Sequence, residues 1–248
     1  MTSTIAWLVV AAFAAGLVDA IAGGGGIITV PALLAAGLDP RVALATNKGQ
    51  AIFGSGASFF AFARHGQIDR GRAPWSFFAA GLGALVGAKL LLWLDPAKLR
   101  PIVLALLLLA AAASFVRKPI NEGEAPVRSP WLAAGIALPI GLYDGFFGPG
   151  TGTFLLLAFA YVYGDDLVRA SGNAKVANFA SNIVAFATFA ATGTIRWEIA
   201  LPMGVAQLAG ALVGTRLAVR RGAGIVKGVA VAVSLALAIR VAWQMIRG

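Results

Sequence analysis

The chain has no cysteine, a single histidine and few charged residues. Without cysteine among its 248 residues, it has no disulfide framework, cysteine–zinc site or iron–sulfur cluster. The lone His65 lies in a basic segment, where we expect it to be solvated. We find no Ser/His/Asp arrangement, no set of metal ligands and no cofactor motif. The sequence therefore predicts a protein that is not an enzyme and that binds no cofactor or metal.

Charged residues make up only 12% of the chain, whereas soluble domains carry about 25%. Hydrophobic residues make up 59%, and the mean hydropathy is +0.85. Several apolar segments reach or approach the roughly 20 residues that a helix needs to cross a bilayer, and they show no strand-like alternation. We therefore expect an all-α polytopic membrane protein. Its net charge of +10 lies mostly in short loops, which indicates orientation in the bilayer rather than binding to nucleic acid.

One segment of the sequence occurs twice. Residues 83–90 read GALVGAKL and residues 210–217 read GALVGTRL, an offset of 127 residues. Near the start of each half the offset is 125, which pairs Asp19 with Asp144, and a two-residue insertion around Thr151–Gly152 explains the difference. The pattern predicts two tandem membrane repeats, residues 1–116 and 131–248, joined by a polar linker at 117–130.

Each repeat contains five apolar segments, of which the second is short. A segment of 12 residues, such as 26–37 or 152–163, rises about 18 Å as a helix, less than the roughly 30 Å of a hydrocarbon core. We expect a hairpin with a glycine-rich tip in each half, and the sequence leaves open whether the short segments are re-entrant or spanning. The expected segments are 5–22, 26–37, 42–63, 74–94 and 98–116 in the first half, and 131–147, 152–163, 167–192, 197–219 and 224–246 in the second.

The charges in the loops predict how the chain is oriented. If each hairpin is one re-entrant unit or two crossings, each repeat crosses an odd number of times and the two repeats are inverted. One side of the membrane then receives 11 Lys and Arg residues and the other receives 6. The positive-inside rule places the richer side, including the linker, in the cytoplasm and both termini outside.

The glycine-rich tips are the first candidate site. A glycine run is poor helix, and broken backbone at membrane depth must be buried in protein or line a cavity. Broken helix ends expose N–H groups that attract anions. The alternative is close helix packing through small residues. The candidate substrate-binding residues of the tips are Gly23, Gly24, Gly25 and Gly26 in the first half, and Gly148, Gly150 and Thr151 in the second.

Charged and amide side chains inside the apolar segments are the second group of candidates. Lys48 and Lys175 occupy matching positions, and an intramembrane cation is a candidate for binding substrate, the alternative being a lysine that reaches out to the interface. Asp19 and Asp144 precede the tips and are candidates for gating or proton coupling, or for counter-ions of the lysines. Asn47, Asn173 and Asn178 are amides that either bind substrate or join helices by hydrogen bonds.

Two stretches resemble a known family. The run GLVDAIAGGGGIITVPALLAAGLDPRVALATNK in the first half and GLYDGFFGPGTGTF in the second resemble the sulfite exporter TauE/SafE permeases. The resemblance covers essentially the whole chain and implies a multi-pass permease of the bacterial plasma membrane. It also implies movement of sulfite, sulfonates or other sulfur-containing anions. The family's glycines correspond to Gly23, Gly24, Gly25, Gly148 and Gly150.

These observations lead to one hypothesis and two alternatives. The hypothesis is a secondary transporter of a small anion, such as sulfite, an organosulfonate or a related sulfur oxyanion, bound between the two tips. Its partners are then the anion and the lipid bilayer. The alternatives are a passive anion channel, whose flux would not depend on a pH gradient, and a membrane scaffold subunit that transports nothing.

Overall fold

The computed structural model describes residues 2–95, 98–99, 101–103, 105–106, 129–222 and 224–225, and these form eight α-helices. The linker at 117–130 and the expected segments 98–116 and 224–246 lie almost entirely outside the described residues. The helices are α1 (Thr2–Ala22), α2 (Gly25–Ala35), α3 (Pro40–Arg64), α4 (Ala73–Trp93), α6 (Pro130–Phe146), α7 (Thr151–Tyr163), α8 (Leu167–Ala191) and α9 (Trp197–Arg221).

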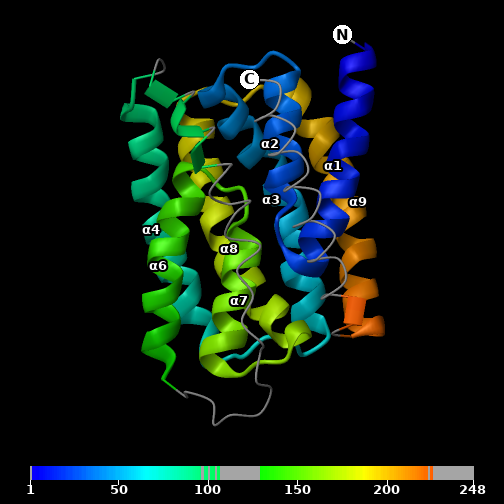
Figure 1. Cartoon of the computed structure of the whole chain (residues 1–248), viewed down its shortest axis with the longest axis vertical. Coiled ribbons are helices and arrows are strands. Elements are labelled where there is room, and N and C mark those ends of the chain that lie inside the picture. The colour runs from blue at the N-terminus through cyan, green and yellow to red at the C-terminus, as the bar shows by residue number, and fades with distance from the viewer. Residues whose placement is uncertain are drawn as a thin grey trace.

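The long helices pack across the two halves of the chain. α4 packs against α6 at one edge of the bundle, α1 packs against α9 at the other, and α3 and α8 lie between them (Figure 1). The short helix α2 lies in the upper half of the view and α7 in the lower half. By the sequence repeat, α4 corresponds to α9 and α6 to α1. The two edge pairs are therefore the same pairing made twice.

The duplicated GALVG segment is the contact surface of both edge pairs. A side chain at Gly83 or Gly87 on α4 would clash with the backbone of α6 at Leu138 or Leu142. Likewise, a side chain at Gly210 or Gly214 on α9 would meet the backbone of α1. Glycines four residues apart let helix backbones approach closely, which is the usual way that membrane helices associate.

The two central helices begin in the same way. The Asp39 side chain accepts a hydrogen bond from the Arg41 N–H at the start of α3. Asp166, 127 residues later, accepts hydrogen bonds from Val168 and Arg169 at the start of α8. These N-caps satisfy N–H groups that would otherwise lack partners. Because α3 and α8 start at matching residues, the buried Lys48 and Lys175 are each the ninth residue of their helix.

The helices sort by length and polarity. Three of them are long and apolar enough, by length and composition, to cross a membrane, within Thr4–Ala22, Ala73–Trp93 and Trp197–Arg221. α3 and α8 have 25 residues each but carry buried asparagine, serine and lysine side chains. α2 has 11 residues and α7 has 13, so both are short, as the sequence predicts. Many of the buried polar side chains of the described residues thus lie on the two central helices.

Candidate functional site

Both predicted helix breaks are present at the glycine-rich tips. Gly23 and Gly24 adopt φ angles of 76° and 93°, and α2 begins at the next residue. Gly148 and Gly150 adopt φ angles of 96° and 89° immediately before α7. Left-handed backbone of this kind costs side-chain-bearing residues about 1–2 kcal/mol, so glycine is favoured at these positions.

The two tips lie directly against each other. A side chain on Gly23 would overlap the backbone of Gly152 and Thr153, so only glycine allows this approach. The Thr153 hydroxyl donates a hydrogen bond of 3.2 Å to the carbonyl oxygen of Ala22. The helix break before α2 is therefore joined, through backbone contacts, to the start of α7.

Two buried ion pairs connect the halves of the chain. The Lys48 Nζ of α3 lies 2.7 Å from the Asp144 carboxylate of α6, and the Lys175 Nζ of α8 lies 2.7 Å from the Asp19 carboxylate of α1. Each lysine of one half thus pairs with the aspartate of the other. Asp19 and Asp144 are therefore counter-ions of the lysines, which is one of the roles considered for them from the sequence. Two positive and two negative charges balance at this site.

Each buried pair has further polar contacts, which buried charges need if their desolvation is to be offset. Lys48 also donates to the Asn182 Oδ1 at 3.3 Å, and Asp144 accepts a hydrogen bond from the Ser181 hydroxyl. Lys175 also donates to the carbonyl oxygen of Asp19 at 2.5 Å. The Asp19 Oδ1 accepts a long hydrogen bond of 3.3 Å from the Gly25 N–H. Asp19 is the more open carboxylate, with a side chain 13% exposed against 2% for Asp144.

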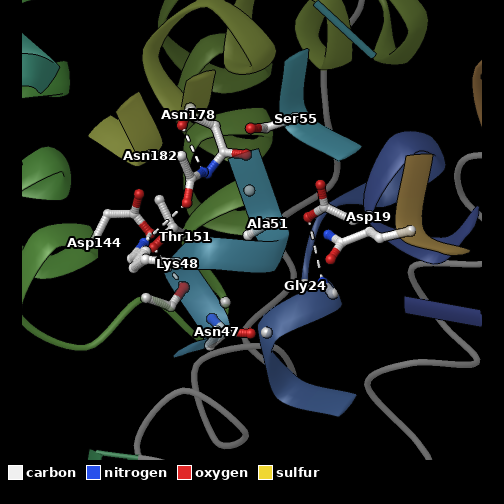
Figure 2. A pocket seen from close by; sticks show the side chains of 16 residues that line it. Asp19, Gly24, Asn47, Lys48, Ala51, Ser55, Asp144, Thr151, Asn178 and Asn182 are labelled. Carbon is white, nitrogen blue, oxygen red and sulfur yellow. Dashed lines mark hydrogen bonds and ion pairs between the residues drawn. The ribbon is translucent and has the colours of Figure 1, made fainter. Parts of the chain in front are cut away.

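A cavity, called here the central cavity, lies where the tips, α3 and α8 meet. The space in it that a water-sized molecule can enter is about 20 Å³, and all of the empty space, its opening included, is about 340 Å³. In Figure 2, Lys48 and Asp144 lie on one side of it and Asp19 on the other. The predicted site residues that line it are Asp19, Gly24, Gly25, Gly26, Asn47, Lys48, Asp144, Gly148, Gly150, Thr151 and Asn178. The lining residues outside that prediction are Ala51, Ser55, Gly152, Asn182 and Gln207.

Three predicted site residues do not line the central cavity. Gly23 lies against Gly152 and Thr153 in the contact between the tips. Lys175 is held by Asp19, as described above. Asn173 lies beside a loop instead, where its Oδ1 accepts a hydrogen bond of 2.8 Å from the Asp69 N–H and its Nδ2 donates one of 2.8 Å to Asp165.

The central cavity offers mainly hydrogen-bond donors on its tip side. The Asn47 Oδ1 accepts from Thr29 at 2.6 Å and from Gln50 at 2.9 Å, which leaves its Nδ2 group for the cavity. The first turns of α2 and α7 also line the cavity, which places the positive ends of two helix dipoles beside it, while the Gly25 and Thr151 N–H groups already donate to Asp19 and Gly148. Together with the Lys48 ammonium, these groups have the chemistry that holds an oxyanion.

Matching hydrogen bonds close the bundle at the two ends of α3. The Asp69 N–H, after the end of α3, donates to Asn173, and the Arg196 N–H donates at 3.1 Å to the Thr46 hydroxyl, near the start of α3. The same offset of 127 residues relates Asp69 to Arg196 and Thr46 to Asn173. Both contacts therefore occupy equivalent places in the two repeats.

The first of these ends carries a cluster of charges, called here the ionic latch and formed by Asp69, Arg72, Asp165 and Arg169, whereas Arg196 at the other end makes an exposed ion pair with Glu198. Arg72 binds both oxygens of Asp165, at 2.9 and 3.0 Å, and lies 3.1 Å from Asp69. Burial raises the pKa of the Asp69 carboxyl, but backbone hydrogen bonds and the charge of Arg72 outweigh it and hold that pKa below its usual value. At the other end, Leu38 and Ile199 stand where Asp165 and Arg72 would be.

Gln207 is one of the lining residues that the reasoning from sequence missed. It is the one amide of the expected segment 197–219, and a buried amide in an apolar segment is a signal for a functional contact. Its position in the first half is occupied by Ala80, so a search based on matching polar residues could not find it.

Comparison with known proteins decides the family. The family model for the sulfite exporter TauE/SafE matches residues 8–241. The chain belongs to the TauE/SafE family. No solved structure matches this family member.

Bacterial relatives cover nearly all of this TauE/SafE protein. It is 44% identical over 241 residues to the probable membrane transporter protein ORF9 of Sinorhizobium sp., covering 95% of this chain and 91% of that protein. It is 34% identical to a probable membrane transporter protein of Haemophilus influenzae, covering 94% and 92%. It is also 34% identical to the probable membrane transporter protein YfcA of Escherichia coli K12, covering 94% and 87%. The protein is thus a membrane transporter of this family.

Proposed function

We propose that this protein is a secondary transporter of a small anion, bound in the central cavity between the two tips. The substrate class is sulfite, an organosulfonate or a related sulfur oxyanion, in keeping with the family's description. The relatives are bacterial and are named as transporters, which supports a multi-pass protein of the bacterial plasma membrane.

One observation carries the proposal. The N-terminal turns of both short helices and the Lys48 ammonium line a single cavity in the middle of the bundle. A helix N-terminus with free N–H groups binds anions, and a pair of them facing one cavity is how discontinuous helices hold substrate in other secondary transporters. The tips and Lys48 would bind the oxyanion, while the apolar edge pairs would face lipid.

The charge balance suggests how transport is coupled. The two lysines and two aspartates already neutralise each other, so an arriving anion adds an uncompensated negative charge to a buried site. Protonation of Asp144 would remove one negative charge and release Lys48 for the anion. Anion and proton would then occupy the site together, with Asp144 as the coupling group and Asp19 as the candidate gate.

The proposed movement is a rocking of two inverted repeats around the central cavity. Support comes from the edge pairs, which repeat one packing surface, and from the matching hydrogen bonds at the two ends of α3. Opening one end would break the Asp69–Asn173 contact and the ionic latch. Opening the other would break the Arg196–Thr46 contact. The tips stay at the site throughout, as alternating access requires.

Flux measurements in proteoliposomes test this function. Purified protein is reconstituted, and uptake of radiolabelled sulfite, taurine and sulfoacetate is followed with and without a pH gradient. We expect saturable uptake of at least one of these anions that is accelerated by the gradient, and we expect Asp144→Asn to lose the acceleration. Uptake that ignores the gradient would indicate a passive channel. Absence of uptake would indicate a scaffold subunit.

A further inference from the structure

The Gln207 side chain is a buried amide whose oxygen has no hydrogen-bond partner among the described residues. Its residue is only 3% exposed, and the Oε1 atom has no hydrogen bond in the part of the chain that the structure describes. A buried amide oxygen without a partner destabilises the folded state, because it has lost its hydrogen bonds to water. Gln207 also lines the central cavity, so a bound molecule could supply the missing partner.

The protein provides a dedicated slot for this side chain. The Gln207 methylenes pass between Gly16 of α1 and Gly54 of α3, and a side chain at either glycine would overlap them. In the other half, the position of Gln207 is Ala80 and the position of Gly54 is Ser181, whose hydroxyl donates to Asp144. The second half of the chain thus has an amide side chain at this position, whereas the first half has an alanine.

The amide lies on the acceptor side of the central cavity. Gly16, which contacts Gln207, precedes Asp19 by three residues on α1, so the two side chains project from one face of the bundle. Asp19 lies across the cavity from Lys48 (Figure 2). The Asp19 carboxylate is more exposed than that of Asp144. The cavity therefore has the Lys48–Asp144 pair at one end, and the Asp19 carboxylate with the Gln207 amide at the other.

We infer that Gln207 determines specificity by binding a hydrogen-bond donor at the far end of the transported anion. This inference rests on the proposed function and narrows its substrate class. A bare oxyanion offers only acceptors, so it satisfies an amide N–H but leaves the amide oxygen without a partner. A hydroxyl or ammonium group two or three atoms from the anionic centre satisfies the oxygen.

Binding of two matched sulfonates to the purified protein tests the inference. Ethanesulfonate and 2-hydroxyethanesulfonate differ by one hydroxyl, and their affinities are measured by calorimetry in detergent. We expect the wild type to bind the hydroxylated anion about tenfold more tightly, as a single satisfied buried acceptor allows. We expect Gln207→Met, which keeps the volume but removes the amide, to bind both anions equally.

Thr215→Val is the matched control. Thr215 lies on α9 as Gln207 does, and its buried hydroxyl also has no partner among the described residues, but it does not line the cavity. This variant should keep the tenfold preference. If Gln207→Met does not fold, two measurements still test the inference. One is the preference of the wild type for the hydroxylated sulfonate. The other is the preference of Gln207→Asn, whose shorter side chain should lose most of that preference.

The possible failures are separable. Equal affinity of the wild type for the two sulfonates, or a preference that survives in Gln207→Met, overturns the role of Gln207. If neither sulfonate binds but sulfite does, the inference is wrong while the proposed function stands. If no anion binds or is transported, the proposed function fails and the inference fails with it.

Discussion

The two buried lysines differ in how completely each is held by protein oxygens. Lys175 donates to the carboxylate and the carbonyl oxygen of the same residue, Asp19, at 2.7 and 2.5 Å. Lys48 holds Asp144 at 2.7 Å, but its second partner is an asparagine at 3.3 Å, and it lines the central cavity. Of the two, Lys48 is the cation that an incoming anion can reach.

Replacing Lys48 should therefore weaken substrate binding specifically. We expect Lys48→Gln to reduce affinity about 30-fold or more, because truncating a desolvated charged contact costs roughly 2–5 kcal/mol. Binding calorimetry with a transported anion provides the measurement. The exposed Lys89, in a lipid-facing segment, is the control, and Lys89→Gln should bind as the wild type does. Equal affinity in both variants would leave the tips to hold the anion without a lysine.

At the scale of single elements, the helix breaks at the tips and the ionic latch are the features on which the proposed movement depends. The glycine run predicted a break, and the short helices begin where it ends. Each tip is thus fixed twice, once by left-handed backbone and once by contact with the other tip. Mutation can separate these two constraints, because other glycines, such as Gly37, have left-handed backbone but make no such contact.

Gly23→Ala should abolish transport, whereas Gly37→Ala should not. Both glycines have positive φ, at 76° and 89°, so both substitutions carry a backbone cost of about 1–2 kcal/mol. Only at Gly23 would the added carbon overlap the other tip, since Gly37 has open space around it. Flux in proteoliposomes and thermal unfolding provide the comparison. Normal flux through well-folded Gly23→Ala would show that the tip contact is dispensable.

The ionic latch should make the stability of the fold sensitive to acid. The folded-state pKa of Asp69 is held below its ordinary value, so its ionised form stabilises the folded state above that value, near pH 4. This contribution is lost as pH falls through the lower, folded-state pKa. In thermal unfolding in detergent between about pH 3 and pH 6, the unfolding temperature should fall more steeply with decreasing pH for the wild type than for Asp69→Asn. Identical slopes would contradict a role for Asp69 in stability.

The sequence predicts the elements of this fold better than their contacts. Segment 26–37 was expected and α2 covers Gly25–Ala35, because glycine, proline and apolar runs act locally. That Lys48 would bind Asp144 rather than Asp19 depends on how the halves pack, which the repeat alone does not determine. Asn173 lies five residues before the cavity-lining Asn178, about 140° around the helix, so it faces a loop instead of the cavity.

At the scale of the whole molecule, the two halves of the chain make several matching contacts but differ at other positions. The ion pairs, tips and end contacts occur twice, whereas the ionic latch and Gln207 occur once. Transport in a single direction, or selection of one end of a substrate, requires such differences. The symmetric parts would form the site, and the unique parts would set its preferences.

The orientation in the membrane is a prediction from the charge asymmetry, since residues 117–128 lie outside the described part of the chain. We expect the linker in the cytoplasm and both termini outside. The chain has no cysteine, so Ser3→Cys and Glu122→Cys each introduce one thiol for an impermeant maleimide in intact cells. Labelling of the Ser3→Cys protein alone is expected. Labelling of the Glu122→Cys protein alone would reverse the orientation.

The central claim, that the anion binds between the tips, is tested most directly by substrate protection of a thiol in the central cavity. Ala51 lines the cavity, and Ala63 lies exposed on the same helix. Ala51→Cys and Ala63→Cys are labelled with N-ethylmaleimide in the presence of rising concentrations of a transported organosulfonate. We predict that the anion slows labelling at Ala51→Cys, with half-maximal protection at its binding constant, and leaves Ala63→Cys unaffected. Unchanged labelling of Ala51→Cys at saturating anion would place the binding site elsewhere.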